Sequence, residues 1–168
     1  MIIYTDASYS NHKNMSGLGV VYVCDYDNNK IIEYGTYSRV CLNNNTAEIA
    51  AIALAIDNLK NKKSSLKLRQ EEAIQIITDS QYAFNKIQHR CYGSNDFERY
   101  CLKTIYNFCE NGGHKVFFYN CKGHCKDKSE MSYYNNRADK LSCYYRKLGY
   151  SIYYSNNPLL RTKNQHTR

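Results

Sequence analysis

Residues 74–84, Ile-Gln-Ile-Ile-Thr-Asp-Ser-Gln-Tyr-Ala-Phe, decide the fold because they pass from one periodicity to another. The β-branched run that ends at Thr78 is typical of a buried strand, and apolar residues then recur with the spacing of a helix. Asp79 therefore stands where a core strand ends, at the edge where open α/β sheets place their chemistry. Either Asp79 or Ser80 could also serve simply as a helix N-cap.

The residues at the start of the chain predict an antiparallel meander. An apolar run over residues 1–9 reads as a strand with Asp6 near its exit. Residues 17–24 and 30–40 read as two further strands with a polar turn between them. The meander therefore brings a second carboxylate to the end of a strand.

The first helix is expected over residues 48–59, which are rich in alanine and carry apolar residues at helical spacing. This pattern predicts an amphipathic helix. Asn45 is a candidate N-cap, and Glu48, three residues later, would complete a capping box. That structural role is one explanation of Glu48, and a chemical role is the other.

The chain after Asp79 predicts three more helices and one more strand. In order these are a helix to about Gln88, a helix over 97–110 that Asn95 or Asp96 caps, a strand over 114–121, and a helix over 133–148 that carries Asp139. Residues 151–168 are basic and hold the only proline, so a frayed tail is expected after a single domain of residues 1–150.

The composition favours an anionic partner and an intracellular protein. Lysine and arginine number 23 against 15 acidic residues, a formal net charge of +8, which is typical of proteins that bind nucleic acid. No run of about eighteen apolar residues is present, so no membrane contact is expected. The first residues lack the signature of a secretion signal. Eight cysteines without a CxxC pair indicate free thiols in the cytoplasm or another reducing compartment.

Four carboxylates stand at comparable places along these elements, namely Asp6, Glu48, Asp79 and Asp139. If the strands that carry Asp6 and Asp79 are neighbours, their ends bring the two side chains together, and the helices lean the other two over them. Anions held so close together repel each other and require a counter-charge. Ligands that offer only oxygen suit Mg²⁺ or Mn²⁺ rather than Zn²⁺. Two such ions could drive in-line hydrolysis of a phosphodiester.

Five short motifs in this order resemble the type 1 ribonuclease H family. They are residues 4–8 (Tyr-Thr-Asp-Ala-Ser), 44–51 (Asn-Asn-Thr-Ala-Glu-Ile-Ala-Ala), 78–82 (Thr-Asp-Ser-Gln-Tyr), 122–124 (Lys-Gly-His) and 135–141 (Asn-Asn-Arg-Ala-Asp-Lys-Leu). The resemblance extends from residue 2 to about residue 148. It implies an α/β ribonuclease H-like fold, a five-stranded mixed sheet in the order 3-2-1-4-5 flanked by helices.

The resemblance also implies a catalytic set. Asp6, Glu48, Asp79 and Asp139 would be the ligands of two Mg²⁺ ions, or of Mn²⁺ in their place. His124 matches the family's flexible histidine, which assists proton transfer or the departure of product. The implied reaction is endonucleolytic hydrolysis of RNA paired to DNA, leaving 3′-hydroxyl and 5′-phosphate ends. A monomer that acts on no small molecule is expected.

The substrate surface is implied in the same way. Asn45 and Gln81 match residues that touch the minor groove of the RNA:DNA hybrid, where 2′-hydroxyls and base edges are exposed. Ser8, Asn44 and Asn135 are weaker candidates for the same surface.

The sequence departs from the family's pattern at three places. Ala7 stands where glycine is usual. The 45 residues from Asp79 to His124 are too few for the basic helix that some members use to grip the hybrid, so the lysines of 60–69, the loop 122–128 or the tail would hold substrate instead. The gap from His124 to Asp139 is long.

Three alternatives remain open at this stage. The first is a zinc-containing nucleic-acid module built on Cys109, His114, Cys121, His124 and Cys125, whose spacing is irregular. The second is a nuclease or junction resolvase of the same fold that acts on DNA. The third is a binding module with an inactive site.

Overall fold

The computed structural model describes residues 1–24, 30–61, 66, 68–69, 72–122 and 129–156 of the 168-residue chain. Nine elements follow one another in these residues. They are β1 (Ile2–Ser10), β2 (Met15–Cys24), β3 (Lys30–Ser38), α1 (Asn44–Lys60), β4 (Ile74–Thr78), α2 (Gln81–Gln88), α3 (Asp96–Asn111), β5 (Val116–Asn120) and α4 (Glu130–Asn156).

The five strands form one mixed sheet in the order β3-β2-β1-β4-β5, which confirms the expected order. The β1–β2 and β2–β3 pairs are antiparallel. The β1–β4 and β4–β5 pairs are parallel, and α1 provides part of the long crossover that a parallel pair needs. The strand with Asp6 and the strand that ends before Asp79 are therefore neighbours.

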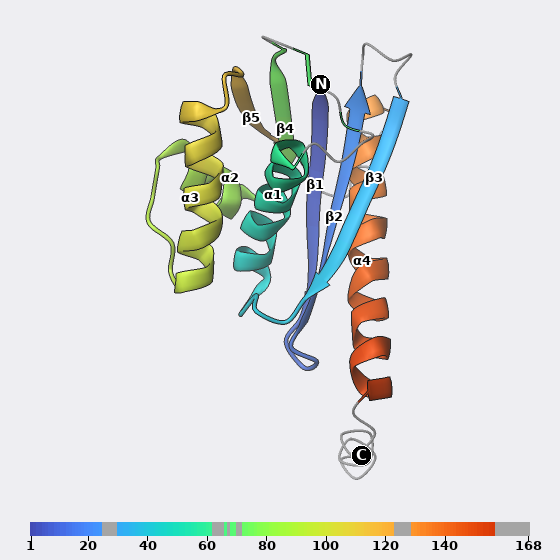
Figure 1. Cartoon of the computed structure of the whole chain (residues 1–168). Coiled ribbons are helices and arrows are strands. Elements are labelled where there is room, and N and C mark those ends of the chain that lie inside the picture. The colour runs from blue at the N-terminus through green and yellow to red at the C-terminus, as the bar shows by residue number, and fades with distance from the viewer. Residues whose placement is uncertain (25–29, 62–65, 67, 70–71, 123–128, 157–168) are drawn as a thin grey trace.

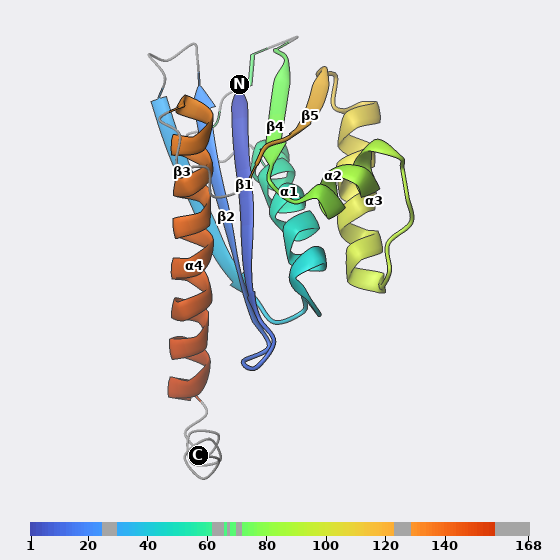
Figure 2. The same ribbon diagram turned by 180° about the vertical axis from the view of Figure 1, so that it is seen from behind.

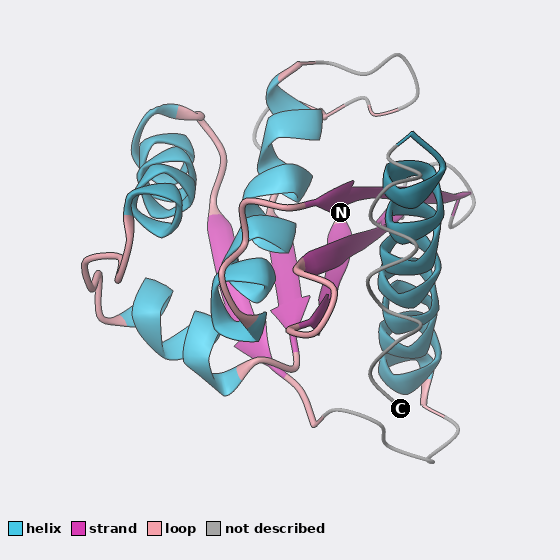
Figure 3. Ribbon diagram, turned by 90° about the horizontal axis from the view of Figure 1, so that it is seen from below, coloured by secondary structure: helices cyan, strands magenta, loops and turns pink. Residues whose placement is uncertain are grey.

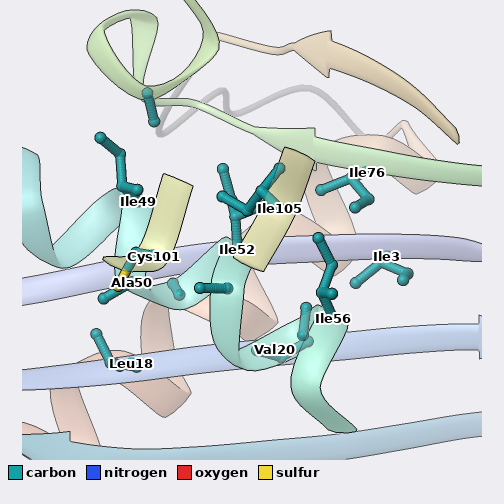
Figure 4. Packing of buried hydrophobic residues seen from close by; sticks show 14 of the residues in the cluster. Ile3, Leu18, Val20, Ile49, Ala50, Ile52, Ile56, Ile76, Cys101 and Ile105 are labelled. Atoms are coloured by element: carbon teal, nitrogen blue, oxygen red, sulfur yellow. The ribbon is translucent and has the colours of Figure 1, made fainter. Parts of the chain in front are cut away.

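Helices cover both faces of the sheet. Figures 1 and 2 show α1 and α3 on one face and α4 alone on the other, and Figure 3 shows the sheet between the two layers from below. The larger core lies under α1 and α3, where Ile3, Val20, Ile52, Ile76 and Ile105 are fully buried (Figure 4). A smaller core lies under α4, and it includes Tyr4, Val21, Ile77, Tyr134 and Ala138. Because both faces are covered, every residue of β2 is buried.

The predicted amphipathic character of the first helix is wrong, because α1 is buried on nearly every side. The sheet covers its inner face and α3 packs on its outer face. Small alanines at positions such as 51 and 55 let both neighbours approach, and these residues are fully buried. In α3, by contrast, Tyr100 is 61% exposed.

The final helix is longer than the sequence predicts, since it ends at Asn156 rather than Leu148. Residues 151–156, which were assigned to the tail, continue α4, and residues 157–168 lie outside the described part of the chain. The other ends differ by a few residues, as is common for boundaries. The last strand, for example, begins at Val116 rather than at residue 114.

Two glycines of β2 let α4 approach the sheet closely. A Cβ on Gly17 would lie 1.8 Å from the carbonyl oxygen of Ser142, and one on Gly19 would lie 2.2 Å from that of Ala138. The backbone of the helix therefore rests on the backbone of the strand. This contact fixes the height of α4 above β1, and with it the position of Asp139.

None of the described helices is both long enough and apolar enough to cross a membrane.

Substitution of Gly19 by alanine tests this close packing. The added methyl group has no room against the helix backbone, so Gly19→Ala should lower the free energy of unfolding by about 1–3 kcal/mol. Thermal unfolding measures the change as a fall in Tm of several degrees. Ser10→Ala on the same hairpin is the control. An unchanged Tm for Gly19→Ala would contradict the close approach of α4.

Candidate active site

Three carboxylates converge at one edge of the sheet. The parallel pairing of β1 with β4 ends at Thr5 and Thr78, so the next residues, Asp6 and Asp79, leave the paired region together. Glu48 reaches the same edge from the second turn of α1. One carboxylate oxygen from each of Asp6, Glu48 and Asp79 lies within 4.8 Å of the other two.

The structural explanations of these acids do not hold. The N-cap of α2 is Ser80, whose hydroxyl accepts from the Ala83 amide at 3.2 Å, so Asp79 is not the cap. The predicted N-cap of α1, Asn45, is also wrong. The cap is Asn43, whose side chain accepts from the Thr46 amide at 2.8 Å, which places Glu48 beyond the reach of a capping box.

Asp139 faces the same cavity from α4. It lies outside the group whose oxygens are within 4.8 Å of one another. It nevertheless borders a cavity of about 390 Å³ together with Asp6, Glu48 and Asp79. None of the described residues that line this cavity is a lysine or arginine. The cavity is thus an acidic pocket with a group of three acids and a fourth at its rim.

Burial and mutual repulsion raise the pKa values of the inner two acids. Burial chiefly raises the pKa of Asp6 from 3.8 to about 7, and the negative charges of Asp79 and Asp139 raise it further. Burial likewise raises the pKa of Glu48 well above its usual value, and the charges of Asp6 and Asp79 add to the effect. Both shifts mean that keeping the carboxylates of Asp6 and Glu48 negatively charged costs free energy.

Neighbouring side chains hold each carboxylate by a hydrogen bond. Ser142, which is fully buried in α4, donates its hydroxyl to Asp6 Oδ2 at 2.5 Å, and this bond lowers the pKa of Asp6 against the effect of burial. The Asn135 amide lies 3.4 Å from Asp79 Oδ2, and the Asn44 amide lies 3.4 Å from Glu48 Oε1. These contacts fix the direction of the three acids.

The expected substrate residues divide into two groups. Asn44, Asn45 and Gln81 are exposed beside the cavity, and Ser8 lines its wall. Asn135 is only 3% exposed and its amide lies 3.4 Å from Asp79 Oδ2, so this structure places it beside a carboxylate, and its contact with substrate stays a prediction. It is a positioning residue for a carboxylate.

Comparison with known proteins places this arrangement in a family. The RNase H family matches residues 1–144. The chain belongs to the RNase H family. That family assignment makes the chain a ribonuclease H, a hydrolase. No curated protein matches the chain.

Solved structures of several proteins share the fold. LC11-RNase H1, isolated from compost by a metagenomic approach and solved with an RNA/DNA hybrid, is 19% identical with a TM-score of 0.65. The match covers 88% of this chain and 97% of that one. RNase H1 from the archaeon Halobacterium salinarum is 18% identical with a TM-score of 0.62, covering 86% of this chain and 95% of that one. The protease-reverse transcriptase of prototype foamy virus is 18% identical with a TM-score of 0.63, covering 86% of this chain and 20% of that one.

The acids of this ribonuclease H fit a divalent cation. Glu48 is 5% exposed, and its Oε2 has no hydrogen-bond partner in the described structure, which is costly for a buried carboxylate oxygen. All the candidate ligand atoms are carboxylate oxygens, which hard cations such as Mg²⁺ prefer. A bound cation would therefore supply both the missing partner and the missing positive charge.

The histidine loop, the lysines of residues 60–69 and the zinc ligands were also expected site features. His124, Cys125 and Lys126 fall within residues 123–128, of which the structure describes nothing. Lys60 ends α1 about 18 Å of helix away from Glu48, so this lysine of the loop 60–69 does not face the cavity. Of the expected zinc ligands that are described, Cys109, His114 and Cys121 form no group able to hold a metal.

Sequence reasoning missed Ser142 and Cys143. Ser142 follows Asp139 by three residues and so shares its helix face, and a serine on the buried side of a helix was the available signal. The Cys143 thiol lies 3.7 Å from Asp139 Oδ1 and 3.5 Å from the Ser8 hydroxyl. Its contact depends on the closeness of α4 to β1, which spacing alone does not reveal.

Removal of the Ser142 hydroxyl tests its role toward Asp6. Because the hydroxyl lowers the pKa of Asp6, Ser142→Ala should raise that pKa and shift the acidic limb of the pH profile of kcat/KM on an RNA:DNA hybrid to higher pH. Ser132→Ala is the matched control, because it removes the hydroxyl of another buried serine of the same helix that does not line the cavity. Identical pH profiles for the two variants would show that the hydroxyl does not act on Asp6.

Proposed function

We propose that this chain is an endonuclease that hydrolyses the RNA strand of RNA:DNA hybrids with Mg²⁺, leaving 3′-hydroxyl and 5′-phosphate ends. The observation that carries the proposal is the convergence of Asp6, Glu48 and Asp79 at the sheet edge, with Asp139 on the rim of the same cavity. Membership of the RNase H family supports it. The structures of LC11-RNase H1 and of the foamy viral protease-reverse transcriptase, each in complex with an RNA/DNA hybrid, support this choice of substrate.

The metal ligands in this proposal are Asp6, Glu48 and Asp79, with Asp139 completing the set. Two divalent ions bound there would supply an activated water and would stabilise the leaving oxygen of the phosphodiester. The chain's own part is to hold the acids ionised and correctly aimed. Ser142 does so for Asp6, Asn135 for Asp79 and Asn44 for Glu48.

Selection of the hybrid falls to exposed polar groups around the cavity. Asn45 and Gln81 are exposed at the starts of α1 and α2, three residues before Glu48 and two residues after Asp79. Their amides can both donate and accept, which suits the 2′-hydroxyls and base edges of a shallow minor groove. In this proposal His124 moves a proton or releases product.

Digestion of a hybrid with labelled RNA tests the proposal. The wild type should cut the RNA strand at internal positions in Mg²⁺ and should leave 3′-hydroxyl ends. It should leave RNA:RNA, DNA:DNA and four-way junction substrates intact. Asp79→Asn should lower kcat by about three orders of magnitude or more, because a metal ligand contributes several kcal/mol to the transition state.

Asp96→Asn is the matched control, since Asp96 is an exposed acid paired with Arg99 that does not line the cavity. It should cleave like the wild type. Full cleavage by Asp79→Asn, or cleavage that persists in excess chelator, would refute the proposed function. Cleavage of the junction alone would instead favour the resolvase alternative.

A further inference from the structure

The second half of α4, from Lys140 to Asn156, carries basic residues and no acidic one. The match to the RNase H family ends at residue 144, whereas α4 continues to Asn156. From Lys140 to the end of the chain the sequence contains no aspartate or glutamate. The β1–β2 hairpin and the end of β3, on which this part of α4 packs, also add cations only, namely Lys13 and Arg39.

Direct contacts join these segments into one surface. The guanidinium of Arg146 donates to the Tyr9 carbonyl oxygen at 3.4 Å. Lys13 Nζ lies 3.6 Å from the centre of the Tyr150 ring, and Arg39 Cζ lies 3.8 Å from that of Tyr153. Figure 1 shows the lower half of α4 beside the hairpin. The end of the helix is therefore docked on the domain.

This surface begins at the catalytic cavity. Asp139, Cys143, Arg146 and Tyr150 follow one another at steps of four, three and four residues, so they share one face of α4. Cys143 contacts both Asp139 and Ser8, and both of these residues line the cavity. A chain of nucleotides leaving the cavity along this face would thus run past Arg146 and Lys13.

The cations here differ in their partners from four other cations of the described residues. Arg90, Arg99 and Arg137 each pair with an acid, as does Lys86 with Glu98. In contrast, Lys13, Arg39, Arg146 and Lys147 have no acid within salt-bridge distance among the described residues. Lys13 and Arg39 stack on rings instead, which leaves their N–H groups able to donate to an anion, and both are exposed, as is Lys147.

We propose that Lys13, Arg39, Arg146 and Lys147, the basic strip, bind the phosphate backbone of the hybrid to one side of the cut. Lys147 is eight residues from Asp139, about 12 Å along the helix, and Tyr150 is about 16 Å from it. At roughly 3.4 Å per nucleotide the strip contacts phosphates about four to five steps from the scissile one. The inference rests on the proposed function, since it places the same substrate.

The salt dependence of binding tests the strip. The parent is Asp79→Asn, which binds hybrid without cutting it, and Lys13→Gln/Lys147→Gln is added to it. On a long hybrid of about 20 base pairs, loss of two phosphate contacts should make the slope of log K against log salt less negative by about 1.8. A hybrid of about 6 base pairs has only about five steps and reaches the strip only when its end lies in the cavity, so the difference between parent and variant should shrink on it.

Lys103→Gln/Lys115→Gln in the same parent is the control, because it removes the same charge from exposed lysines on α3 and at the amino end of β5. Its slope should equal that of the parent at both lengths. Equal slopes for the strip variant and this control on the long hybrid would overturn the basic strip while leaving the proposed function intact. Failure of the parent to bind any hybrid would overturn the proposed function itself, and the strip with it.

Discussion

Repulsion between carboxylates that the fold forces together is the constraint on which the site depends. Two negative charges about 5 Å apart repel by roughly 3 kcal/mol at an effective dielectric constant of about 20. Asp6 and Glu48 are 6% and 5% exposed, so water relieves little of this cost. A protein keeps such a cluster only if something compensates for it. Three hydrogen bonds do so in part, and the unpartnered oxygen of Glu48 marks what is left for a cation.

The fold holds this cluster of carboxylates in place. The parallel β1–β4 pair sets Asp6 beside Asp79, and helices on opposite faces of the sheet deliver Glu48 and Asp139 to the same edge. Each helix is fixed by close packing: α1 lies between the sheet and α3, and α4 rests on the glycines of β2. Since cores this dense do not deform easily, the repelling acids cannot move apart to relieve their charge.

The sequence predicts the strands because strand periodicity depends on local residues. The resemblance of the ordered motifs to a known family implies the strand order and the roles of the four acids. The sequence does not reveal Ser142 or the true place of Asn135, whose roles arise from contacts between α4 and residues more than fifty positions away. The burial of α1 is missed for the same reason, since α3 covers it. Asn43 was overlooked as the cap because three asparagines in succession offer equal candidates. The length of α4 depends on its docking against Tyr9, Lys13 and Tyr37.

Thermal unfolding as a function of pH and Mg²⁺ tests the central claim most directly. The pKa of Asp6 in the folded state is about 7 against 3.8 ordinarily, so its protonated form stabilises the fold at low pH, and this stability is lost as the pH rises through about 7. In chelator, the Tm of the wild type should therefore fall from about pH 4 to about pH 7, and over this range the Tm of Asp6→Asn should fall less than the Tm of Asp96→Asn. Mg²⁺ should restore the wild-type Tm at the higher pH by binding only the folded state. A wild-type Tm that responds to neither pH nor Mg²⁺ would contradict the account.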